Sequence, residues 1–187
     1  MVLAQRLTEA QYLDLILHDD YVTWELWDGE PREKSTMSVQ HGDASMTLGA
    51  WLYVQGDREG STVRRNHAKA RLNPRNFYIP DVAVIPTRYF GPNWRDPSTP
   101  DAYAGPLPLV VEIWSPTTGD YDVAVKLRGY QERFDEEIWY LHPYDRTLTR
   151  WLRQADGAYA ESVLRGGVVA LAALPNVTID LDALFAG

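Results

Sequence analysis

Apolar residues recur at helical spacing near the start of the chain and alternate with polar residues after it. Residues 8–17 open with Thr8, which can cap a helix, and continue with apolar residues three and four positions apart. Residues 22–27 and the Asp28-Gly29 turn are typical of the first half of a β-hairpin. A second helix is expected from Ser38, its cap, to about Gln55.

The remainder of the pattern predicts strands around one further helix. Two short apolar runs, residues 76–85 and 107–114, have the length and the β-branched content of buried strands. The helix is expected at residues 122–134. Further strands are expected at residues 137–142 and 147–153, as a hairpin, and near residues 159–164 and 177–181.

One long segment has no regular pattern. Residues 87–106 are rich in proline, glycine and aromatic residues. A loop of this length inside a compact domain is usually functional or mobile. With no repeat and no linker, the pattern predicts one α/β (α+β) domain over residues 1–187, a mixed central sheet flanked by helices with an acidic site at one edge.

Two acidic residues interrupt the apolar runs. Asp81 lies in the first run and Glu112 in the second. An ionised carboxylate in a buried strand loses its hydration, which costs several kcal/mol unless a cation or hydrogen-bond donors compensate. Two such residues on successive strands indicate convergence on a metal ion.

Composition narrows the class of protein. The chain has 187 residues, 45% of them hydrophobic, with no cysteine and a formal net charge of −8. This composition is that of a globular protein, and the lack of cysteine fits a reducing cytosol. We expect no signal peptide and no membrane segment. The high load of aromatic residues, with seven Trp and eleven Tyr, favours an aromatic-rich interface.

One short stretch is basic although the whole chain is acidic. If residues 64–71 form a strand, Arg65, His67, Lys69 and Arg71 line one face of it and are candidates for nucleic-acid contact. The alternative is a solvated edge strand whose charges discourage aggregation.

The acids and a following lysine allow metal-assisted chemistry. Asp81 and Glu112 would lie on neighbouring strands, with Lys126 on the helix after the second strand. Carboxylates and water are the ligands that Mg²⁺ prefers. A bound metal lowers the pKa of water and offsets charge on a phosphoryl oxygen, and an ammonium group can stabilise the same charge. The spacing alone is weakly specific.

The residues around these three make the pattern more specific. Residues 78–86, 108–118 and 122–130 read YIPDVAVIP, PLVVEIWSPTT and DVAVKLRGY. Together with residues 24–30, 137–143 and 174–181, they resemble the Uma family of bacterial restriction-endonuclease-type proteins, within the PD-(D/E)xK nuclease superfamily. The resemblance extends from about Thr8 to about Phe185.

This resemblance implies roles for individual residues. Asp81 would be the acid of the Pro-Asp pair and Glu112 the second metal ligand. The lysine expected two residues after Glu112 is absent, because Trp114 stands there, and Lys126 matches the helix lysine that takes its place.

Four other residues are implied as support. Asp122 and Tyr130 flank Lys126 at four residues on either side and share its helical face. Glu25 and His41 match positions that would face the same pocket, as a third metal ligand or as support for the ligands.

The expected activity is hydrolysis of phosphodiester bonds by an endonuclease, in DNA, with Mg²⁺ (or Mn²⁺) as cofactor. Lys126 would assist the attacking water. The basic segment and the loop residues Arg88, Trp94 and Arg95 would hold the nucleic-acid backbone. A homodimer would pair two sites for the two strands of a duplex.

Structural explanations of the same residues stay open. Asp81 could satisfy backbone donors, Glu112 could pair with an arginine, and Lys126 could form a surface pair with Asp122. Two other functions also remain: a nuclease fold that binds or assembles without cutting, and a glycoside hydrolase with paired carboxylates.

Overall fold

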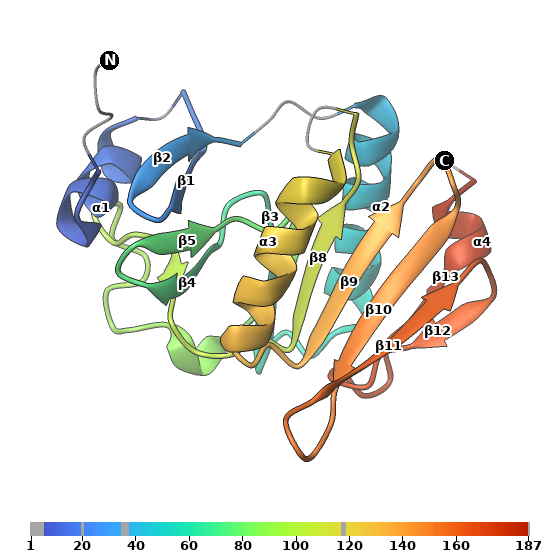
Figure 1. The fold of residues 1–187 in the computed structure, drawn as a ribbon. Helices are drawn as coiled ribbons and strands as arrows, with labels where there is room; N and C mark the ends of the chain where they lie inside the picture. Colours follow the sequence, from blue (N-terminus) through green and yellow to red (C-terminus); the bar gives the residue numbers. More distant parts are fainter. Residues whose placement is uncertain (1–5, 20, 35–37, 117–118, 187) are drawn as a thin grey trace.

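The computed structural model describes residues 6–19, 21–34, 38–116 and 119–186 (Figure 1). In chain order the elements are α1 (Glu9–His18), β1 (Trp24–Trp27), β2 (Glu30–Glu33), α2 (Val39–Gln55), β3 (Ser61–Arg65), β4 (Lys69–Asn73), β5 (Asn76–Tyr78), β6 (Val82–Pro86), η1 (Thr87–Tyr89), β7 (Ala102–Tyr103), β8 (Leu109–Ile113), α3 (Gly119–Glu132), β9 (Glu137–His142), β10 (Thr147–Arg153), β11 (Tyr159–Leu164), β12 (Val168–Ala170), β13 (Thr178–Asp180) and α4 (Leu181–Leu184).

The largest sheet has six strands in the order β11-β10-β9-β8-β6-β3. It is mixed, because β8 and β9 run parallel whereas the other neighbours run antiparallel. In Figure 1, α3 crosses one face of this sheet and α2 lies behind the other. The predicted mixed central sheet flanked by helices is therefore confirmed.

A second sheet was not predicted as a separate layer. Five strands in the order β2-β1-β5-β4-β7 lie beside the six-stranded sheet (Figure 1). Helix α1 packs on it through Tyr12, which contacts Leu26 and Phe77 in a small buried cluster. A two-stranded ribbon, β12-β13, carries the strand β12 that the sequence pattern missed. None of the helices formed by the described residues is long and apolar enough to cross a membrane.

Alternation along β8 decides which way its side chains point. Val111 packs in the cluster that includes Leu48 and Leu52 of α2, whereas Val110 packs with Tyr130 of α3. Because side chains of a strand alternate between faces, Glu112 lies on the same face as Val110, toward α3. Both β6 and β8 are interior strands, so the expectation that the acids lie at one edge of the sheet is wrong.

The basic stretch is not one strand, which corrects a second expectation. Arg65 ends β3 in the six-stranded sheet, whereas Lys69 begins β4 in the other sheet. Asn66 breaks the run with a positive φ of 52°, a left-handed conformation that asparagine adopts more readily than most residues. Arg65, His67, Lys69 and Arg71 therefore do not share a strand face.

A buried arginine joins the end of α3 to the five-stranded sheet. The Arg133 guanidinium donates to the backbone carbonyl oxygens of Arg71, Tyr103 (2.9 Å) and Gly105 (2.6 Å). Its Nε lies 3.1 Å from Oδ2 of Asp135, and both side chains are buried. One side chain thus satisfies several acceptors that water cannot reach.

Replacing Arg133 with methionine should destabilise the protein. The substitution leaves the Asp135 carboxylate and the carbonyl oxygens without their donor, and removing one partner of a buried ion pair costs about 3–5 kcal/mol. Urea unfolding of the variant measures the loss. Arg153→Met is the matched control, because Arg153 is exposed over the Phe134 ring and surface changes cost about 0.5 kcal/mol or less.

The loss of unfolding free energy caused by Arg133→Met should depend on pH. Burial raises the pKa of Asp135 to about 6, and Arg133 opposes that rise. Without the guanidinium this pKa rises further, so the folded state takes up a proton before the unfolded state does as the pH falls. The loss in unfolding free energy should be smaller at about pH 5 than at about pH 8. Equal losses at both values would show that Asp135 does not carry the effect.

Candidate active site

Asp81 lies at the entry to β6 and is held by three donors. Lys34 Nζ lies 2.8 Å from its Oδ1, and His41 Nε2 lies 2.9 Å from its Oδ2. The backbone N–H of Ile113 donates to Oδ2 at 2.6 Å. The main chain is fixed as well, because the Asp81 N–H donates to the Val111 carbonyl oxygen at 2.9 Å. The carboxylate therefore cannot turn without breaking several contacts.

These partners keep Asp81 ionised although only 2% of the residue is exposed. Burial raises its pKa, but the Lys34 ammonium and the His41 hydrogen bond outweigh burial. The pKa of Asp81 therefore lies below its ordinary value of 3.8. Helix α2 supplies His41 from its first turn, where Ser38 caps the helix by accepting from the His41 N–H at 3.3 Å.

Glu112 is bound by two residues of α3. Lys126 Nζ lies 3.3 Å from its Oε1, and the Tyr130 hydroxyl donates to the same oxygen at 2.5 Å. Lys126 and Tyr130 are four residues apart, so they occupy one face of the helix. Burial raises the pKa of Glu112, and the Lys126 ammonium opposes that rise without cancelling it.

Glu25 reaches the same lysine from the other sheet. Its Oε1 lies 2.7 Å from Lys126 Nζ and also accepts from the Ile79 N–H at 2.7 Å. Its Oε2 accepts from the Trp27 indole N–H at 3.1 Å. Lys126 therefore lies between a carboxylate of β1 and a carboxylate of β8.

The side chains linked by these contacts form one group, which we call the acid–lysine cluster: Glu25, Lys34, His41, Asp81, Glu112, Lys126 and Tyr130. Burial lowers the pKa of Lys126, but Glu112, Glu25 and Asp81 together raise it above its ordinary value. These acids hold Lys126 as a protonated ammonium, which can orient a nucleophile or stabilise negative charge.

The cluster contains most of the residues that the sequence selected. Asp81, Glu112, Lys126, Glu25, His41 and Tyr130 are brought together. Lys126 is buried rather than on the surface, and the partners of Glu112 are lysine and tyrosine rather than arginine. The side chain of Asp122 lies outside the described residues, so its predicted support of Lys126 stays a prediction.

Lys34 is the member that the sequence missed. It directly follows β2, and its Nζ also donates to the Ile79 carbonyl oxygen at 2.5 Å. A lysine after a polar strand is ordinary in sequence. Only the placement of the β1–β2 hairpin against the segment before β6 reveals its role.

The four basic residues proposed for nucleic-acid contact have separate surroundings. Arg65 donates to the Ser45 hydroxyl at 3.2 Å, and Arg71 pairs with Glu9 at 2.7 Å. Lys69 is buried, and burial lowers its pKa. His67 lines a surface pocket. Their contact with nucleic acid stays a prediction, carried by individual residues rather than by a common strand face.

The acids of the cluster have the donor chemistry that a hard divalent cation requires. Within the described part of the chain, no three His, Asp or Glu side chains are grouped closely enough to hold a metal ion on their own. Mg²⁺, however, commonly takes one or two carboxylates and completes its shell with water and substrate phosphate. Asp81 and Glu112, on paired strands, fit that requirement.

Comparisons with known proteins identify the family and the fold. A model of the Uma2 family, described as "Putative restriction endonuclease", matches residues 9–182. The crystal structure of a "putative nuclease belonging to DUF820" from Anabaena variabilis ATCC 29413 is similar, with a TM-score of 0.76 and 13% sequence identity over 96% of this chain and 98% of that chain. At this identity the likeness shows a shared fold. No match was found among the curated proteins. Since the family model covers nearly the whole sequence, the chain belongs to the Uma2 family.

Proposed function

We propose that the protein is a metal-dependent endonuclease that hydrolyses phosphodiester bonds in DNA. The observation that carries the proposal is the position of Lys126, a buried ammonium between Glu25 and Glu112 in the cluster that also contains Asp81. Buried charges in such an arrangement are expensive for stability, which favours a functional reason for them. The nuclease family to which the chain belongs supports the reaction class.

Asp81 and Glu112 would hold Mg²⁺ or Mn²⁺, and Glu25 would support the site by holding Lys126 beside them. A divalent metal there would supply a Lewis acid and a water of lowered pKa. Lys34 and His41 fix the Asp81 carboxylate, and Tyr130 fixes that of Glu112, so both acids are held in place and a cation would share them with, or displace, these donors.

Lys126 would contribute positive charge next to the reacting phosphate. Its raised pKa keeps the ammonium protonated, so it would orient the attacking water or stabilise the charge that builds on the phosphoryl oxygens. Positioning by Glu25 gives this ammonium a fixed place on the sheet side of α3.

The finer identity of the substrate and assembly is part of the proposal. DNA is the substrate that a restriction-type family favours, and a homodimer in the cytoplasm would place two such sites for the two strands of a duplex. A second candidate is a nuclease fold that binds or assembles without cutting. The ion pairs that already occupy Asp81 and Glu112, together with the net charge of −8, favour this alternative.

Calorimetric titration of Mn²⁺ tests the metal site. Glu112→Gln should lose most of the Mn²⁺ binding seen with the unmodified protein, because the neutral amide cannot compensate a divalent charge. Asp135→Asn is the matched control, since Asp135 is an equally buried acid beside an arginine and outside the cluster. Identical isotherms for the unmodified protein and Glu112→Gln would remove the metal from the proposal.

Replacing Lys126 with methionine should separate metal binding from catalysis. The variant keeps the carboxylates and should still bind Mn²⁺, but it loses the ammonium, and loss of one such group costs about 10²–10³-fold in rate. The measurement is nicking of supercoiled plasmid with Mn²⁺, after circular dichroism has shown that the variant is folded. Retention of full activity in Lys126→Met would exclude the role given to this lysine.

Plasmid nicking must also be shown to belong to this protein. Asp81→Asn should abolish it, since that carboxylate is the acid most tightly fixed in the cluster. Equal nicking by Asp81→Asn and the unmodified protein would point to a contaminating nuclease and would favour the non-cutting alternative.

A further inference from the structure

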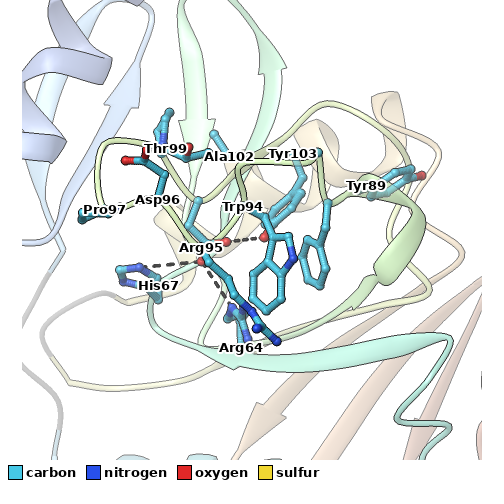
Figure 2. A pocket seen from close by; sticks show the side chains of 14 residues that line it. Arg64, His67, Tyr89, Trp94, Arg95, Asp96, Pro97, Thr99, Ala102 and Tyr103 are labelled. Atoms are coloured by element: carbon cyan, nitrogen blue, oxygen red, sulfur yellow. Dashed lines mark hydrogen bonds and ion pairs between the residues drawn. The ribbon is translucent and has the colours of Figure 1, made fainter.

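Two cavities adjoin along the loop between β6 and β8. The first, of about 510 Å³, is shown in Figure 2, and the second has about 560 Å³. Both are of the size that accommodates a small organic ligand. The residues that line both cavities, and so form the wall between them, are Arg64, Phe90, Gly91, Trp94 and Arg95.

The shared wall is aromatic and cationic. Phe90 and Trp94 stack with ring centroids 4.9 Å apart and planes tilted by 18°. Arg95 lies 4.7 Å over the Trp94 ring, and Arg64 lies 5.8 Å from the Phe90 ring centroid. Figure 2 shows the Trp94, Arg64 and Arg95 side chains gathered on one side of the first cavity. Phe90 covers one face of the Trp94 ring and Arg95 lies over the other, but Trp94 keeps 42% of its surface exposed and Arg95 is itself exposed, so a flat ligand can stack on the ring by displacing the guanidinium.

The two cavities differ in charge. Asp101 lines the first one, where it lies 3.6 Å from Arg64 Nε and 3.7 Å from His67 Nε2. The second cavity is lined by three arginines and two threonines and by no acid: Arg58, Arg64, Arg95, Thr62 and Thr87, beside Phe90, Gly91, Pro92 and Trp94. Among the ion pairs formed by the described residues, neither Arg58 nor Arg95 takes part. The second cavity therefore has the donors for a phosphate, and the first has a ring-lined space beside it.

The cavities are connected to the acid–lysine cluster through β3. Arg64 is paired with Ala83 of β6, two residues after Asp81. The N–H of Asn66 donates to the Asp81 carbonyl oxygen at 3.1 Å, and His67 of the first cavity is the next residue. The cavities and Asp81 thus lie on neighbouring segments of the chain.

We propose that the paired cavities bind one nucleotide of an unpaired nucleic-acid strand, with its base against Phe90 and Trp94 and its phosphate among Arg58, Arg64 and Arg95. The inference rests on the proposed function, for which it names the form of the substrate. Bases inside a duplex already stack on both faces, so only an unpaired base can stack on an exposed aromatic ring. Single-stranded or locally opened nucleic acid is therefore the preferred partner.

Binding of a fluorescent single-stranded DNA of roughly 16 nucleotides to the full chain in EDTA tests this inference without any cleavage. The single strand should bind more tightly than the same sequence annealed into a duplex. The affinity for single-stranded RNA of the same sequence shows whether binding depends on the sugar. The affinity for a mononucleotide shows whether binding requires a strand of linked nucleotides.

Variants of the shared wall give the quantitative test. Trp94→Ala should weaken single-strand binding by about 5- to 100-fold, whereas Trp94→Phe, which keeps a stacking ring, should lose much less. Arg95→Gln should reduce the slope of log affinity against log salt concentration by about 0.7, the amount expected for one phosphate contact. Arg153→Gln is its matched control, an arginine over an aromatic ring that lines neither cavity, and it should leave the slope unchanged.

The inference is overturned by any of three results: equal affinity for single strand and duplex, equal affinity for the mononucleotide and the strand, or unchanged binding in both Trp94→Ala and Arg95→Gln. The cleavage assay is read separately. Single-strand binding that depends on Trp94 without nicking in Mn²⁺ would refute the endonuclease and leave the nucleotide site standing. Nicking by a protein that shows no preference for a single strand would support the endonuclease and refute the nucleotide site.

Discussion

Lys126 joins the three parts of the molecule on which the candidate site is built. Its helix α3 covers the six-stranded sheet, and its ammonium contacts Glu112 of that sheet and Glu25 of the five-stranded sheet. Neither carboxylate could remain buried and charged without a shared cation, because desolvation would cost several kcal/mol for each. The docking of α3 and the approach of the two sheets are therefore linked through one nitrogen atom.

The charges around Asp81 and Glu112 explain why their pKa values shift in opposite directions. Asp81 has Lys34, His41 and a backbone N–H, and its pKa lies below the ordinary value, whereas that of Glu112 lies above it. Two neighbouring carboxylates with separated proton affinities are a common property of functional sites. The same pairing gives the second candidate function its support, because cations of the protein already occupy the positions of charge compensation.

Local pattern was sufficient for the parts of the fold that depend on neighbours in sequence. The helices capped by Thr8 and Ser38 follow from their periodicity and caps, and β6 and β8 follow from apolar runs. The second sheet did not follow, because its strands are short and the pairings that assemble it, β1 with β5 and β4 with β7, join segments far apart in sequence. The left-handed Asn66 was also missed, and that one residue sends β3 and β4 into different sheets. Lys34 was missed for the same reason, since its role exists only across a tertiary contact.

Trp114 stands two residues after Glu112, where it stacks on His142 at 4.4 Å and meets Tyr144 edge-on. The strand consequently offers no ammonium of its own at that position, and the charge must arrive from a helix that is made later in the chain. A nascent or partly unfolded polypeptide has the acids but lacks the assembled centre. The proposed centre thus exists only where α3 is docked on the sheet, so its completeness depends on the packing of that helix.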